Sequence, residues 1–171
     1  MAWSMDFVSD QTSSGTKFRA LTIVDVFTRE CLAIEPGQSW KGEDVARVLT
    51  AIAWTRPLPQ RIHCDNGSEF AGRSMDLWAY ANKVILEFSR PGKPTDNAYI
   101  ESFNGSLRDE CLNVHWFADL TDARTILRKN PLVSAVVELL ILMLITMALL
   151  SVMTDVTPMH LKLSLVLVDA E

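Results

Sequence analysis

Residues 61–70 read RIHCDNGSEF and residues 97–112 read NAYIESFNGSLRDECL, and these two stretches decide the fold. In the first, a short strand runs to Asp65 and is followed by an Asn-Gly turn. In the second, apolar residues recur at spacings of three and four, which predicts an amphipathic helix capped by Asp96 or Asn97. A strand and a helix in this order are typical of α/β proteins.

The flanking segments predict the rest of a sheet. Helix-spaced apolar residues predict one helix that begins at Gly42 and is stopped by Pro57, and a second helix around residues 75–81. Each of these helices bridges two strands and therefore implies a parallel crossover, added to an antiparallel meander of the first three strands. The expected fold class is α/β, a mixed sheet with flanking helices. The expected strands cover residues 3–9, 18–25, 31–35, 61–65 and 84–89.

The charge of the chain excludes one way of binding nucleic acid. The 171 residues are 49% hydrophobic and carry 16 Lys and Arg against 21 Asp and Glu, a formal charge of −5. A protein that coats nucleic acid through bulk electrostatics needs many cations to displace counterions from phosphates. Any nucleic-acid contact is therefore local. The charge is also uneven, because residues 130–171 hold only one Lys beside four acids.

The cysteines and the N-terminus favour a cytoplasmic location. Cys31, Cys64 and Cys111 are widely spaced and form no CxxC pair, so neither a disulfide framework nor a zinc site is predicted. We expect buried thiols in a reducing compartment. The opening MAWSMDFVSD has no basic-then-apolar stretch, so no secretory signal is predicted.

Three carboxylates occupy comparable places in the predicted fold. Asp6 lies in the first strand, Asp65 ends the fourth, and Glu101 lies in the opening turns of the helix after the fifth. Ligands of open α/β sheets collect at such strand ends, so the three could converge. Each also has an ordinary explanation: Asp65 as a turn residue, Glu101 as an acid that favours the helix dipole, and Asp6 as a strand residue that faces water.

The helix favours convergence over the ordinary explanations. Glu101, Asn104 and Arg108 share one face by helical geometry, beside an apolar stripe that would pack on the sheet. The polar face is then directed toward the sheet end where Asp6 and Asp65 are expected. Three carboxylates that close repel one another unless a cation neutralises them, and hard oxygen ligands favour Mg²⁺ or Mn²⁺. Two such ions would promote an in-line phosphoryl displacement.

These segments resemble the catalytic core of insertion-sequence transposases related to retroviral integrases. The resemblance covers about residues 3–127 and depends on HCDNGSEF and ESFNG in this order, with 35 residues between Asp65 and Glu101. It implies a ribonuclease H-like fold in which Asp6, Asp65 and Glu101 coordinate two Mg²⁺ or Mn²⁺ ions. It also implies DNA, both element ends and target, as the partner, with hydrolysis that exposes a 3′-OH and strand transfer by that hydroxyl.

The resemblance also implies roles for residues around the triad. Residues of the second motif would shape its turn, two residues on the helix would lie beside the triad, and cations near the site would position DNA phosphates without reading sequence. For Arg90 and Lys93 a solvated loop is the alternative. The residues carried over are Asn66, Gly67, Glu69, Arg90, Lys93, Asn104 and Arg108.

The chain departs from the family pattern at both ends. No helix-turn-helix region precedes the core, so we expect end recognition to be lost or supplied by another polypeptide. We expect residues 1–129 to form an incomplete catalytic core, and an apolar tail at 130–171, produced by a frame shift or fusion, to replace the rest of the fold. Residues 132–153 are long enough to span a bilayer and hold one charge, Glu138, but we expect that charge to disfavour insertion.

The departures leave more than one function open. The first is DNA transposition by a metal-dependent core, in a copy that is degenerate or inactive and that pairs with itself or with full-length transposase. The second is a non-catalytic remnant that only associates with full-length transposase or DNA. A weaker alternative is a fragment tethered to a membrane through residues 132–153.

Overall fold

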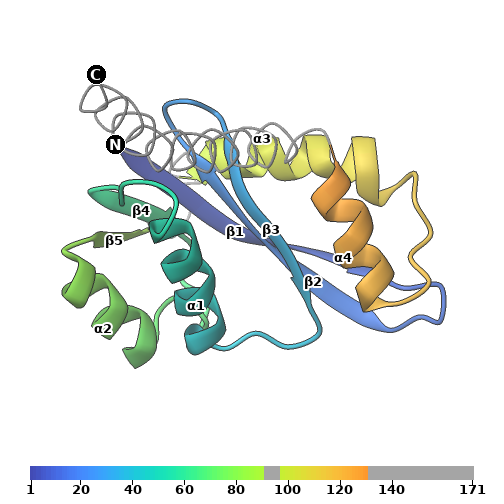
Figure 1. Ribbon diagram of the computed structural model, residues 1–171, viewed down its shortest axis with the longest axis horizontal. Coiled ribbons are helices and arrows are strands. Elements are labelled where there is room, and N and C mark those ends of the chain that lie inside the picture. The colour runs from blue at the N-terminus through green and yellow to red at the C-terminus, as the bar shows by residue number, and fades with distance from the viewer. Residues whose placement is uncertain (91–96, 131–171) are drawn as a thin grey trace, which may run out of the picture. The chain divides into compact units, whose positions relative to one another are not determined.

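The first strand is the centre of the sheet. The computed structural model describes residues 1–90 and 97–130. In it β1 pairs antiparallel with β2 from Trp3 opposite Asp25 to Gln11 opposite Lys17, and pairs parallel with β4 on its other side. The order is β3-β2-β1-β4-β5, with β2 and β3 antiparallel and β4 and β5 parallel (Figure 1). The strands are β1 (Ala2–Gln11), β2 (Lys17–Asp25), β3 (Cys31–Gly37), β4 (Arg61–Cys64) and β5 (Ile85–Phe88). The predicted mixed α/β sheet is confirmed.

The helices follow the predicted apolar periodicity. The first has a buried stripe of Val45, Leu49 and Ile52, the spacing that a helix needs to place side chains on one face. The last is capped by Asp119, whose carboxylate accepts hydrogen bonds from the main-chain N–H groups of Thr121 and Asp122. The helices are α1 (Gly42–Ala53), α2 (Arg73–Asn82), α3 (Ala98–Leu107), the π-helical turn η2 (Arg108–Leu112) and α4 (Leu120–Lys129).

Two apolar clusters fill the two faces of the sheet. The first cluster joins β1 side chains such as Trp3 and Met5 to α1 and α2. The second joins β1 and β2 side chains such as Val8 and Ala20 to the end of α3, to η2 and to α4. Figure 1 shows the same division, with α1 and α2 on one side of the strands and α3 and α4 on the other. Because side chains alternate along a strand, Asp6 belongs to the face that α3 covers.

Three local features differ from the sequence prediction. The strand β3 continues through Pro36, which lies opposite Ala20, because an edge strand tolerates a residue without an N–H group. The strand β4 ends at Cys64, so Asp65 belongs to the following loop. Asn97 occupies the N-cap position of α3, but its side chain makes no cap hydrogen bond and instead accepts one from Ser4 Oγ. Asn97 therefore holds the predicted N-cap position without capping through its side chain, and Asp96, the other predicted cap, lies outside the described residues.

Several predictions fall outside the described residues. Lys93 lies there, as does the chain after residue 130, including the candidate membrane segment at 132–153. The boundary between a core at 1–129 and a tail at 130–171 stays a prediction. Within residues 1–90 and 97–130, no helix is both long and apolar enough to cross a membrane.

Candidate active site

The three predicted carboxylates come from three elements that meet on the α3 side of the sheet. Ser4 of β1 lies opposite His63 of β4, and continuing this parallel register places Asp65 level with Asp6. Glu101 lies in the first turn of α3, which packs on β1 and β2. Asp6 is half-buried, whereas Asp65 and Glu101 are exposed. The fold therefore brings residues from positions 6, 65 and 101 to one end of the sheet.

The carboxylate of Asp6 interacts electrostatically with those of Asp65 and Glu101. Burial raises the pKa of Asp6 above its ordinary value, and the negative charges of Asp65 and Glu101 raise it further. Hydrogen bonds from the Phe7 main chain and from Asn104 act in the opposite direction. A neighbouring cation would therefore favour the ionised form of Asp6.

Asn104, predicted to lie beside the triad, contacts Asp6 directly. Its Nδ2 lies 2.9 Å from Asp6 Oδ2, and its Oδ1 lies 2.8 Å from the hydroxyl of Thr22 on β2. Arg108, one turn further along the helix, donates instead to the main-chain oxygen of Ser9 at 2.9 Å. Asn104 thus lies at the acidic site, and Arg108 anchors the end of α3 to β1.

The turn after β4 is held close to Asp65. The main-chain N–H of Gly67 donates to Asp65 Oδ1 at 2.8 Å, and Asn66 Nδ2 donates to the main-chain oxygen of Ser89 at 2.9 Å. A Cβ at Gly67 would lie 2.9 Å from Asp65 Oδ1, closer than real Cβ atoms approach an oxygen. An alanine here would therefore push the end of the Asp65 side chain away from the turn.

Glu69 and Phe70 attach the same turn to the hairpin of β1 and β2. Arg19 of β2 forms an ion pair with Glu69 and lies over the ring of Phe7, with 4.6 Å from the guanidinium carbon to the ring centre. The ring of Phe7 in turn stacks on Phe70 at 5.1 Å. Although partial burial acts to raise it, hydrogen bonds from Arg19, Ser68 and its own main chain hold the pKa of Glu69 below its usual value. Glu69 thus stays ionised and ties the turn to β2.

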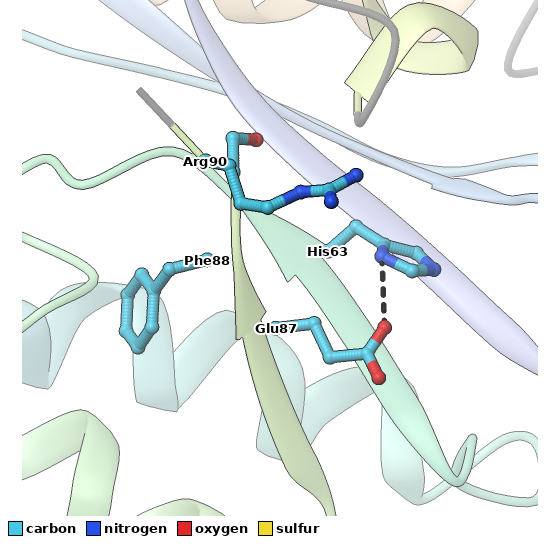
Figure 2. Close-up of a pocket in the computed structure, with 5 residues that line it drawn as sticks. His63, Glu87, Phe88 and Arg90 are labelled. Carbon is cyan, nitrogen blue, oxygen red and sulfur yellow. Dashed lines mark ion pairs between the residues drawn. The ribbon is translucent and has the colours of Figure 1, made fainter. Parts of the chain in front are cut away.

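A pocket of about 340 Å³ lies beside the turn, at the ends of β4 and β5. It is lined by His63, Glu87, Phe88, Ser89 and Arg90. Figure 2 shows the side chains of His63, Glu87 and Arg90 on one side of the strands, with Phe88 directed the other way. His63 Nδ1 lies 3.2 Å from Glu87 Oε2, which places a polar pair next to Arg90 in the pocket wall.

The donor set at the sheet end fits a hard divalent cation in its chemistry. Carboxylate oxygens are the ligands that Mg²⁺ and Mn²⁺ prefer, and the charge on Asp6 is disfavoured by two further carboxylates. Among residues 1–90 and 97–130, however, no three His, Cys, Asp or Glu side chains are grouped in a way that could hold a metal ion. Asp6, Asp65 and Glu101 therefore lie within electrostatic range of one another but not in a chelating arrangement.

Sequence reasoning missed two residues that support the site. Thr22 lies directly opposite Asp6 in the hairpin, a position that could have been found by counting the register outward from the loop at residues 12–16. Arg19 pairs with Glu69, which is 50 residues away, and no local pattern indicates such a partner. The first residue was predictable and the second was not.

The fold and the acidic site together define an integrase-type core. A family model described as integrase core domain matches residues 1–94, and a second model of the same description matches residues 82–129. The chain belongs to this integrase core domain family and is an insertion-sequence transposase or integrase core.

Similar proteins come from insertion elements. The chain is 50% identical over 125 residues to the insertion element IS407 uncharacterized 31.7 kDa protein of Burkholderia multivorans, covering 73% of this chain and 45% of that protein. It is 44% identical over 125 residues to the IS476 uncharacterized 39.2 kDa protein of Xanthomonas euvesicatoria, covering 73% and 36%. It is 29% identical over 123 residues to the transposase for IS904 of Lactococcus lactis, covering 71% and 48%. The chain thus spans less than half the length of these relatives.

Solved structures show the same fold at low identity. A chain of the simian T-cell lymphotropic virus intasome, in complex with PP2A regulatory subunit B56 gamma, superposes with a TM-score of 0.58 at 19% identity, covering 63% of this chain and 38% of that chain. The HTLV-2 integrase catalytic core domain in complex with magnesium superposes with a TM-score of 0.54 at 17% identity, covering 72% and 79%. These neighbours confirm the predicted ribonuclease H-like class.

Proposed function

We propose that this chain is the catalytic core of an insertion-element transposase, which hydrolyses a DNA phosphodiester to expose a 3′-OH. That hydroxyl then attacks a phosphodiester of another strand and displaces the 3′ oxygen there. The observation that carries the proposal is the charge coupling of Asp6 to Asp65 and Glu101 on a family fold. The similarity to a protein named as a transposase supports the reaction class.

Asp6, Asp65 and Glu101 would hold two Mg²⁺ or Mn²⁺ ions. When bound, such a pair activates an attacking oxygen and stabilises the leaving oxygen of an in-line displacement. Neighbouring groups orient two of the carboxylates, because Asn104 holds Oδ2 of Asp6 and the N–H of Gly67 holds Oδ1 of Asp65. No residue needs to form a covalent bond to DNA in this scheme.

The pocket beside the turn would take part in holding DNA. Arg90 lines it together with His63, and both lie at the same strand ends as Asp65. A guanidinium there would bind a backbone phosphate and position the duplex without reading its sequence. Lys93, which follows Arg90 in the chain, is proposed for the same role. Arg108 contributes indirectly, because it anchors α3 to β1.

The proposed reaction needs partners beyond this chain. Element ends and target are separate DNA duplexes, so we propose that the core works in an oligomer, with itself or with full-length transposase. A helix-turn-helix module supplied by another domain or polypeptide would recognise the element ends. In the alternative function, the chain binds DNA or full-length transposase through the same surfaces but catalyses no reaction.

The test is cleavage and joining of a labelled DNA duplex by the purified chain with Mg²⁺ or Mn²⁺. The Glu101→Gln variant removes one carboxylate charge from the site, and Glu110→Gln removes an exposed charge from η2 as a matched control. The departures at both ends of the chain predict a degenerate or inactive copy, so any activity that the wild type retains should persist in Glu110→Gln and be lost in Glu101→Gln. Equal activity in Glu101→Gln would contradict the assigned site. A folded wild type that binds DNA but cleaves none would favour the non-catalytic alternative.

A further inference from the structure

The hydroxyl of Thr22 lies at the base of the acidic site. Thr22 is completely buried on β2, directly opposite Asp6 in the antiparallel register. Its Oγ1 lies 2.8 Å from Asn104 Oδ1 and 3.1 Å from the main-chain oxygen of Asp6. Asn104 Nδ2 then lies 2.9 Å from Asp6 Oδ2. A chain of hydrogen bonds therefore runs from β2 through α3 to the carboxylate on β1.

The directions of these hydrogen bonds agree with one another. A carboxylate accepts hydrogen bonds, so Asp6 requires the NH₂ end of the Asn104 amide. The oxygen end of that amide then faces Thr22, whose hydroxyl can donate to it. The reverse orientation would place the amide oxygen against the carboxylate oxygen. Asp6 therefore selects this orientation of Asn104, and the Thr22 hydroxyl supports it by donating to the amide oxygen.

Because this network is buried, the Thr22 hydroxyl is difficult to replace as the donor to Asn104. Thr22 has no exposed surface and Asn104 is 9% exposed, so water has little access to replace a missing donor. A buried acceptor that loses its partner carries the full cost of desolvation. Without the hydroxyl, the Asn104 amide would turn or shift, and Asp6 would lose its fixed orientation.

We propose that Thr22 is a positioning residue of the metal site, which acts through the Asn104 amide to orient the carboxylate of Asp6. The proposal rests on the proposed function, because it requires Asp6 to bind the cation. Residues that orient metal ligands from behind commonly contribute about tenfold or more to metal affinity. Thr22 belongs to this class although it touches neither metal nor DNA.

The experiment compares variants of the full chain that change one group each. Thr22→Val keeps the shape and the β-branch but removes the hydroxyl, and Thr22→Ser keeps the hydroxyl. Thr12→Val makes the same chemical change in the β1–β2 loop, where the Thr12 hydroxyl contacts Ser14 and Thr16. Asp6→Asn identifies which bound ion belongs to the site.

Two readouts are measured, and neither depends on catalysis. Electron paramagnetic resonance of free Mn²⁺ gives the affinity of each variant, and NMR of the metal-free protein follows the side-chain amide of Asn104. We expect about tenfold weaker Mn²⁺ binding and a shifted Asn104 amide in Thr22→Val, with Thr22→Ser and Thr12→Val close to wild type. Thermal unfolding verifies that each variant is folded.

The outcomes separate this proposal from the proposed function. Wild-type affinity or an unshifted Asn104 amide in Thr22→Val would overturn the role of Thr22 and leave the metal site standing. An equal loss in Thr22→Ser would also overturn it, because the effect would then come from packing. A wild type without Mn²⁺ binding that depends on Asp6 would overturn the metal site, and the role of Thr22 with it.

Discussion

Replacing Gly67 by alanine should damage the acidic site while leaving the fold intact. The added Cβ would lie 2.9 Å from Asp65 Oδ1, 3.3 Å from Glu69 Oε2 and 3.6 Å from Phe70 Cδ2. The Asp65 carboxylate must retreat by roughly half an ångström before the contact reaches an ordinary 3.4 Å. The hydrogen bond from the Gly67 N–H to that carboxylate, now 2.8 Å, is then stretched or lost.

The effects on stability and on metal binding should differ in size. Among residues 1–90 and 97–130, Gly15 is the glycine with a positive φ, so an alanine at position 67 is not strained by its backbone. A Gly→Ala change at a permitted conformation gains about 0.4–1 kcal/mol through the unfolded chain, which offsets part of the weakened hydrogen bond. We expect the free energy of unfolding to stay within about 1 kcal/mol of wild type. The Asp65 carboxylate would lose the hydrogen bond that orients it, so Mn²⁺ affinity should fall about tenfold or more.

The assay combines a Mn²⁺ titration with urea denaturation of the same samples. Gly105→Ala on α3 is the matched control, because a Cβ there meets no atom within 4 Å. It should raise the free energy of unfolding by about 0.5–1 kcal/mol and leave Mn²⁺ affinity unchanged. Wild-type affinity in Gly67→Ala would refute the predicted displacement of Asp65. So would a loss of affinity accompanied by several kcal/mol of lost stability, since the site would then have failed with the fold.

Three further predictions concern the fold. Asp119→Ala removes the two hydrogen bonds that begin α4 and should lower the free energy of unfolding by about 1 kcal/mol in urea; no change would show that the cap is dispensable. Ile62→Ala, at a fully buried position of β4, should cost about 2–5 kcal/mol by the same measurement, and a cost below about 1 kcal/mol would contradict the packing of the first cluster. Burial raises the pKa of the Cys31 thiol to about 12, so the reactive thiolate is scarce at pH 8 and increases as the pH rises toward that value. A disulfide reagent at pH 8 should therefore leave Cys31 unmodified in the native chain and modify it in guanidinium, whereas rapid native labelling would show an open thiol.

The sequence predicted best what depends on local pattern. The α1 stripe and the alternating residues of β1 and β2 have strong periodicity, so those elements lie where they were expected. The convergence of Asp6, Asp65 and Glu101 was predicted from their places at element ends, and the structure brings them into electrostatic range. Their role as metal ligands stays a prediction.

What the sequence could not predict depends on contacts between distant segments. That β4 pairs with β1 rather than with β3 is decided by the packing of the whole sheet. The ion pair of Arg19 with Glu69 and the hydrogen bond from Ser4 to Asn97 join residues 50 and 93 positions apart. Asn97 was predicted as a cap because its residue type favours that position, but a tertiary partner claims its side chain. At this position the hydrogen bond with Ser4 replaces the side-chain cap that the residue type favours.

The two apolar clusters of the core can form at different times during synthesis of the chain. Every residue of the first apolar cluster lies before residue 90, so that half of the core can close once β5 has emerged from the ribosome. The second cluster also needs Leu107 and later residues up to Leu127. A ribosome needs about 2 to 7 seconds to add the residues between position 90 and position 127. During this interval Val8, Phe18 and Ala20 face water on the nascent chain. This is the window in which a chaperone, or another nascent copy, would meet an unfinished sheet.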